Sequence, residues 1–213
     1  MRGFRNRIDA GEALADALEG ADLDDPLILA LPRGGIEVAA PVARRLDAPL
    51  DVLLVRKIGV PWQPELAMGA IAEGGYTVRD DRVVTEAGVG GREFERVVAR
   101  EQQEIERRAT RYRGDRPPPD LTDRIVVIVD DGLATGSTAR VAVQAARAGG
   151  AAAVIVAVPV GSPQAVQLLE TLADDVLCLL APSGFSAVGG WYADFRQVTD
   201  EQVRDVLVAA RSA

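Results

Sequence analysis

The feature that most constrains this 213-residue chain is the segment VVIVDDGLATGST, which begins at Val126. Four apolar β-formers lead into two adjacent carboxylates, Asp130 and Asp131, and a loop of small residues then leads into a helix expected to open at Ser137. Continuous Val/Ile runs are typical of strands buried in a parallel sheet, and the carboxyl ends of such strands point into the ligand crevice. The segment therefore predicts an α/β fold with a ligand site at this strand end.

The residue types of this segment suit a sugar diol that carries a phosphate. Two neighbouring carboxylates can accept hydrogen bonds from two neighbouring hydroxyls. Backbone N–H groups at a helix N-terminus, helped by nearby side-chain hydroxyls, can cradle a phosphate. The expected phosphate-binding residues are Ala134, Thr135, Gly136, Ser137 and Thr138. The simplest alternative is a chance strand–turn–helix with acidic residues at the strand end.

Composition excludes several function classes. The chain has no histidine, which removes Ser–His triads, histidine bases and nearly all zinc chemistry. A net charge of −8 argues against broad binding to nucleic acid or to an anionic membrane. The longest apolar run, residues 151–160, is too short to cross a bilayer. The single cysteine, Cys178, lies in an apolar run and is expected to be a buried strand residue. We expect a cytoplasmic protein without nucleic-acid or membrane partners.

Lys57 is the only lysine among 24 basic residues. It follows Arg56 at the end of a strand expected over residues 51–55, and a loop is expected from residue 58 to residue 64. Lysine and arginine behave differently at phosphate sites, so a single lysine in an arginine-rich chain suggests a particular task. The alternative is a lysine that is merely solvated at the surface.

Strand, loop and helix alternate along most of the chain, which indicates a parallel sheet with connecting helices. A first helix is expected from Ala10, with Asp9 and Glu12 as a capping box. The pattern breaks within residues 76–122, which include a long charged helix over residues 92–113 with one apolar stripe. We interpret these residues as an insertion in a single domain, 1–213, and the stripe as core contact. Expected core strands are 27–31, 51–55, 125–129, 154–158 and 176–180, and later helices are 137–148, 164–172 and 200–211.

The motif around Asp130 and Asp131 resembles the binding motif of type I phosphoribosyltransferases for phosphoribosyl pyrophosphate (PRPP). The order of segments also resembles uncharacterised bacterial phosphoribosyltransferase-domain proteins over nearly the full length. The resemblance implies a Rossmann-like parallel-sheet core with a helical insertion and a C-terminal hood. It implies that the acidic pair holds the ribose 2- and 3-hydroxyls and that the loop holds the 5-phosphate. It also implies Mg²⁺, bound through PRPP, with Asp130 and Asp131 as candidate ligands.

A second loop, after the first core strand, contains Arg33, Gly34 and Gly35. Two glycines let a backbone approach an anion closely, and arginine can fork onto phosphate oxygens. The alternative is an ordinary turn. The loop resembles the pyrophosphate loop of the family, and that likeness implies a cis peptide bond between Pro32 and Arg33. By the same likeness, Arg56 and Lys57 begin a mobile loop that closes over the pyrophosphate.

The segment 182–195 resembles the hood that selects the acceptor base. Its candidate acceptor-binding residues are Phe185, Val188 and Trp191, because aromatic side chains can stack on a flat heterocycle. The alternative is a small aromatic core beneath the hood. The 6-oxopurine enzymes of the family carry an acid at the position of Ala134, and its absence argues against hypoxanthine or guanine as the acceptor.

The function expected from this resemblance is transfer of the 5-phosphoribosyl group from PRPP to a nitrogenous base, with release of pyrophosphate. Arg33, Lys57, Asp130 and Asp131 are the expected catalytic residues. The rival is a non-catalytic module that senses PRPP. Hydrolytic use of the acidic pair ranks last, since no second acidic cluster is present for two metals. The sequence leaves open which base is the acceptor and whether the protein forms a homodimer. Glu65 is the candidate for the general base.

Overall fold

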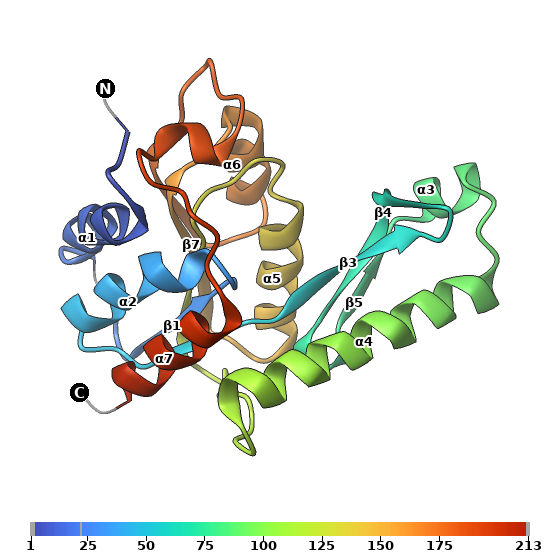
Figure 1. The fold of residues 1–213 in the computed structure, drawn as a ribbon, viewed down its shortest axis with the longest axis horizontal. Coiled ribbons are helices and arrows are strands. Elements are labelled where there is room, and N and C mark those ends of the chain that lie inside the picture. The colour runs from blue at the N-terminus through green and yellow to red at the C-terminus, as the bar shows by residue number, and fades with distance from the viewer. Residues whose placement is uncertain (1–2, 22, 212–213) are drawn as a thin grey trace.

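The computed structural model describes residues 3–21 and 23–211. Its centre is a five-stranded sheet in the order β2-β1-β6-β7-β8, seen on the left of Figure 1. All neighbouring pairs in this sheet are parallel, which confirms the predicted α/β class. The strands are β1 (Pro26–Ala30), β2 (Leu50–Val52), β6 (Ile125–Val129), β7 (Ala153–Val160) and β8 (Asp175–Leu180).

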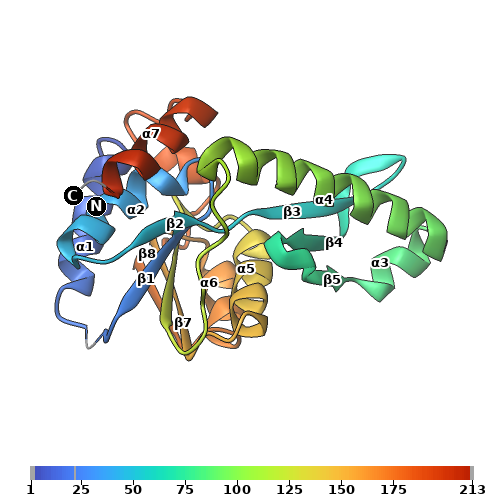
Figure 2. The same cartoon turned by 90° about the horizontal axis from the view of Figure 1, so that it is seen from below.

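Helices cover both faces of the parallel sheet, as Figure 2 shows. Residues that alternate along a strand point to opposite faces. Ile28 and Val127 accordingly pack with α1 (Arg7–Leu18), α2 (Gly35–Arg45) and α7 (Asp200–Ala210). Leu29 and Ile128 pack on the other side with α5 (Ser137–Ala148) and α6 (Pro163–Glu170). Strands buried on both faces explain the continuous apolar runs in the sequence.

Helix α1 begins three residues earlier than predicted. Asn6 is its N-cap, and the Asn6 side-chain oxygen accepts a hydrogen bond from the Asp9 backbone N–H at 2.9 Å. The predicted capping box at Asp9 is therefore wrong, because Asn6 already takes that role. As a result Arg7 lies in the first helical turn, where it is buried.

Residues 55–113 form a second unit, called here the arm, which extends to the right of the core in Figure 1. It contains the antiparallel strands β3 (Val55–Val60), β4 (Gln63–Ala72) and β5 (Thr77–Arg79), then α3 (Asp81–Glu86) and α4 (Gly91–Arg113). The loop predicted at residues 58–64 is wrong, since β3 and β4 pair as a hairpin around Pro61 and Trp62. The antiparallel strands also begin at Val55, before the predicted insertion.

Helix α4 joins the arm to the core. Its apolar stripe is buried, as predicted, through Phe94, Val97, Ile105 and Tyr112. At its last residue the buried Arg113 guanidinium pairs with Asp51 at 2.7 Å and with Glu73, and so connects α4 to β2.

Among the described residues, no helix combines the length and apolar character that crossing a membrane requires.

Candidate active site

Two strand ends meet at the centre of the sheet. β1 and β6 are neighbours, with Ala30 opposite Val129, and the Leu31 N–H donates to the Val129 carbonyl oxygen at 2.8 Å. The chain leaves β1 toward β2 on one side and leaves β6 toward β7 on the other. Such a reversal of strand order opens a ligand crevice at the carboxyl ends of the strands. The glycine loop after β1 and the acidic pair after β6 therefore lie side by side.

The glycine loop approaches the acidic pair too closely for any larger residue. A Cβ on Gly34 would lie 1.9 Å from Oδ2 of Asp131, and one on Gly35 would lie 2.7 Å from the Val129 carbonyl oxygen. Glycine at both positions is thus a steric requirement of this site. The peptide bond between Pro32 and Arg33 is cis, as the family resemblance implied.

Each carboxylate of the acidic pair has one oxygen engaged by the protein. Asp130 Oδ1 accepts the Asp131 backbone N–H at 2.8 Å, and Asp131 Oδ2 accepts Nε of Arg7 at 2.8 Å. Within the part of the chain that the structure describes, the other oxygen of each carboxylate has no hydrogen-bond partner. The site therefore offers two acceptors, which matches the two hydroxyls of a sugar diol.

Burial shapes the charge state of this pair. It raises the pKa of Asp130 well above the ordinary value, and the charge on Asp131 raises it further. Burial also raises the pKa of Asp131, while the hydrogen bond and charge of Arg7 oppose that shift. A ligand that brings hydroxyl donors or a cation would stabilise the charged form of both groups.

The loop over residues 132–136, called here the phosphate loop after the ligand expected for it, is fixed by β7 and the start of α6. The Leu133 N–H donates to the Val160 carbonyl oxygen at 2.9 Å, and the Ser162 hydroxyl donates to the Ala134 carbonyl oxygen at 2.7 Å. Gly136 then takes a left-handed conformation, with φ of 72°, and α5 begins. The backbone N–H groups of Thr138 and Ala139 have no protein acceptor in the described residues, which leaves them available to an anion.

A cavity of about 160 Å³ connects this loop to Asp130 and to the arm. Its lining comprises Lys57, Asp130 and residues 132–139. Lys57 thus extends from β3 into the site, and it makes no ion pair with a described residue. The preceding residue faces the opposite way, since Arg56 donates to Glu101 on α4 at 2.7 and 2.9 Å. The structure brings Lys57 to the phosphate loop and leaves Arg56 in the arm.

The remaining predicted residues lie at the margins of the site. Nη1 of Arg33 is 3.8 Å from a carboxylate oxygen of Asp200, at the start of α7. The three residues expected to bind the acceptor are Phe185, Val188 and Trp191. They are partly buried and pack against Ala10, Val160 and Tyr192. Val188 also covers Gly132 of the phosphate loop, where a Cβ would lie 2.7 Å from its methyl carbon.

Three further residues, Trp62, Glu65 and Cys178, lie apart from the proposed chemistry. Trp62 is 60% exposed at the hairpin turn, so in this structure it neither covers the site nor packs in a core. Glu65 is exposed near the same turn. The Cys178 thiol is half-buried on β8, and burial raises its pKa to about 11, as expected for an unreactive thiol.

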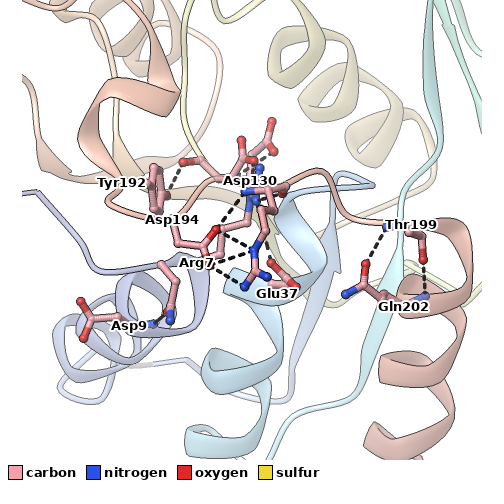
Figure 3. Close-up of polar contacts among 11 residues, drawn as sticks. Arg7, Asp9, Glu37, Asp130, Tyr192, Asp194, Thr199 and Gln202 are labelled. Atoms are coloured by element: carbon pink, nitrogen blue, oxygen red, sulfur yellow. Dashed lines mark hydrogen bonds and ion pairs between the residues drawn. The ribbon is translucent and has the colours of Figure 1, made fainter.

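Sequence reasoning missed Arg7 and the backbone contact of Tyr192, both drawn in Figure 3. The Tyr192 hydroxyl donates to the Asp131 carbonyl oxygen at 2.6 Å. The sequence carried no signal for Arg7, because the helix was expected to begin only at Ala10, whereas in the structure Arg7 is its first residue. Beyond Arg7 lies a cavity of about 360 Å³ with mostly polar walls, which include Glu37, Asp194 and Gln202.

The family model for the phosphoribosyl transferase domain matches residues 5–194. This chain belongs to that family. A protein of Mycobacterium tuberculosis named "Putative phosphoribosyl transferase Rv0571c" is 48% identical over 203 residues, which is 95% of this chain and 46% of that protein. The chain therefore spans about half the length of the curated relatives that it matches.

Solved structures agree with the fold of this phosphoribosyl transferase domain. The crystal structure of TT1426 from Thermus thermophilus is 45% identical, with a TM-score of 0.86 over 98% of this chain and 99% of that one. The structure of AQ2163 from Aquifex aeolicus is 14% identical, with a TM-score of 0.53 over 95% and 85% of the two chains. The second likeness concerns the fold alone.

Proposed function

We propose that the protein transfers the 5-phosphoribosyl group of PRPP to a nitrogenous acceptor and releases pyrophosphate. The observation that carries this proposal is the pair of partner-free carboxylate oxygens on Asp130 and Asp131, next to the phosphate loop and Lys57. These groups match, in order, a diol, a 5-phosphate and further phosphate charge. PRPP presents all three of these groups on one ribose.

The residues would act mainly by position and charge. Asp130 and Asp131 orient the ribose, so that C1 faces the acceptor in a reactive geometry. The amides around residues 134–138 anchor the 5-phosphate. Arg33, the Gly34–Gly35 amides and Lys57 stabilise the negative charge that develops on the leaving pyrophosphate as the C1–O bond breaks. The transition state has oxocarbenium character, so its positive charge is favoured by the nearby carboxylates.

The site fits Mg²⁺ only together with the substrate. No group of three acidic, histidine or cysteine side chains among the described residues could enclose a metal ion. Mg²⁺ is commonly held by one or two carboxylates plus substrate phosphates, which matches what Asp130 and Asp131 offer. When bound, the ion would supply charge neutralisation to the pyrophosphate. The acceptor-binding role of Phe185, Val188 and Trp191 stays part of the proposal.

The test is a phosphorus NMR time course of PRPP and Mg²⁺ with a pool of purine and pyrimidine bases. We expect a pyrophosphate signal that grows only with protein and base together, and splitting the pool then identifies the acceptor. The double variant Asp130→Asn with Asp131→Asn should bind PRPP at least 100-fold more weakly, since each charged hydrogen bond contributes about 1.5–3 kcal/mol.

The matched control is Glu170→Gln, which removes an exposed carboxylate at the end of α6 and should leave turnover unchanged. PRPP resonances that broaden without turnover would favour a sensing module in place of an enzyme. Sharp, unchanged resonances with wild-type protein would overturn the PRPP assignment itself. Retained PRPP affinity in the folded double variant would overturn the role of the acidic pair.

A further inference from the structure

Arg7 is a buried cation in an unfavourable helix position. It lies in the first turn of α1 and is 6% exposed. The N-terminus of a helix favours negative charge, so the helix itself gives this guanidinium no support. Burying a charge is expensive unless it is paired and hydrogen-bonded. The partners of Arg7 therefore explain its position, and one of them, Asp131, belongs to the proposed site.

Arg7 connects three segments that are distant in the sequence, as the dashed lines in Figure 3 trace. Its Nε donates to Asp131 Oδ2 at 2.8 Å, and its Nη1 donates to the Arg196 carbonyl oxygen at 2.8 Å. The guanidinium lies 3.8 Å from the ring centroid of Phe195 and 3.9 Å from a carboxylate oxygen of Glu37. One side chain thus joins the acidic pair to the segment that follows the hood.

These contacts hold Asp131 at both ends of the residue. The Tyr192 hydroxyl holds the backbone carbonyl at 2.6 Å, while Arg7 holds Oδ2 of the side chain. The backbone of Gly34 lies against the same oxygen. Rotation of the carboxylate is thereby restricted, and Oδ1 is left facing away from Arg7 with no protein partner in the described residues.

We propose that Arg7 is a positioning residue for the ribose, which engages Oδ2 of Asp131 so that Oδ1 is presented to one hydroxyl of the diol. The inference rests on the proposed function, because the ribose of PRPP supplies that diol. Arginine suits the task, since its planar group holds two donors in fixed directions and stacks on an aromatic ring. A lysine ammonium could reach Asp131 but could not keep the other contacts with the same geometry.

Two phosphorus NMR titrations test this inference, one with ribose 5-phosphate and one with methyl phosphate, which lacks the diol. Arg7→Gln should weaken ribose 5-phosphate binding about 10- to 100-fold, the usual loss for a hydrogen bond to a charged group. Methyl phosphate binding should change by less than about twofold, because the phosphate loop does not contact Arg7. Arg7→Lys should recover part of the loss. Arg5→Gln is the matched control, since Arg5 is exposed and pairs with Asp9 outside the site.

Equal losses for the two ligands in Arg7→Gln and Arg7→Lys would mean that Arg7 only supports the fold, and would overturn the inference. Unchanged ribose 5-phosphate binding in a folded Arg7→Gln variant would overturn it as well. A wild-type protein that binds ribose 5-phosphate no better than methyl phosphate would have a different meaning, because the diol site and hence the proposed function would then fail. Circular dichroism of each variant distinguishes local from global changes.

Discussion

The core and the arm hold their carboxylates in opposite electrostatic environments. In the core, Asp130 and Asp131 lie at the end of a buried strand and share one cation, Arg7, so that burial raises the pKa of both. In the arm, the Glu104 carboxylate on the surface of α4 accepts hydrogen bonds from Arg107 and Arg108, and these lower its pKa to about 2.

The difference indicates which part of the molecule carries function. Arm carboxylates such as Glu86 and Glu104 are paired with arginines of their own helix, and such exposed pairs add a little to stability. The charged forms of Asp130 and Asp131 are disfavoured by burial in the ligand-free protein, and a bound ligand would stabilise them. Strain of this kind is typical of binding sites, where groups are preorganised for a partner. The arm contributes one cation to that site, Lys57, which makes no ion pair with a described residue.

Arg113 is an exception to this contrast between core and arm, because its buried guanidinium joins the arm to the core. Arg113→Met would leave Asp51 and Glu73 without their main cation. Removing one partner of a buried ion pair usually costs about 3–5 kcal/mol, so we expect that loss in the free energy of unfolding from urea titration. Arg82→Met removes an exposed pair with Glu86 and should cost less than about 1 kcal/mol. A similar small loss at Arg113 would mean that the apolar stripe of α4 alone holds the arm.

Glycines of the two regions should respond differently to an added methyl group. In Gly34→Ala the new carbon meets Asp131, so the loop must shift, and misplacement by about 1 Å can cost 100-fold in a preorganised site. We expect a loss of about that size in PRPP affinity, measured by calorimetry. A Cβ at Gly91 of the arm would meet nothing within 4 Å. Gly91→Ala should leave PRPP affinity unchanged, and equal effects at the two positions would contradict the comparison.

The core could be predicted closely from the sequence because its signals are local. The strand predicted over residues 125–129 is β6 itself, and the strand predicted over residues 27–31 differs from β1 by one residue at each end. Buried parallel strands read as unbroken apolar runs, and the motif that follows β6 contains both the acidic pair and the phosphate loop. The pairing of β1 with β6, which the sequence did not specify, brings the glycine loop next to that motif.

The arm and Arg7 could not be predicted, because their causes are distant in the sequence. Pro61 and Pro64 gave residues 58–64 the composition of a loop, yet pairing between β3 and β4 and the cover of α4 make a hairpin. Arg7 lies 124 residues before its partner Asp131. No local pattern reports such a contact.

Lys57 gives a way to sharpen the comparison, since it is the one arm side chain that lines the phosphate-loop cavity. Lys57→Gln should lower PRPP affinity or turnover about 10- to 100-fold, because the proposed function has this ammonium donate a charged hydrogen bond to a phosphate oxygen. Arg92→Gln removes an exposed cation of α4 and should have no such effect. Comparable losses in both variants would point to the net charge of the arm in place of a specific contact.

Stability at different pH separates the two carboxylate environments directly. The folded-state pKa of Asp130 is raised, so the charged group destabilises the ligand-free fold once the pH rises above its unfolded value of about 3.9. Asp130→Asn should therefore stabilise the protein at pH 7 by about 0.5–2 kcal/mol, the usual range for one stabilising substitution, and the gain should vanish near pH 3. Thermal unfolding without PRPP measures it. A loss of stability at pH 7 would show that the charge of Asp130 supports the fold.

The opposite sign is expected in the arm, with a smaller size. The folded-state pKa of Glu104 is lowered to about 2, so its stabilising contribution is complete above an unfolded value of about 4.3 and is lost as the pH falls from there toward 2. Glu104→Gln should lower stability at pH 7 by less than about 1 kcal/mol, since the pairs are at the surface. Salt should shrink the difference, because exposed charges are screened. If Glu104→Gln instead stabilised the protein at pH 7, as Asp130→Asn is expected to, the contrast between the two regions would not hold.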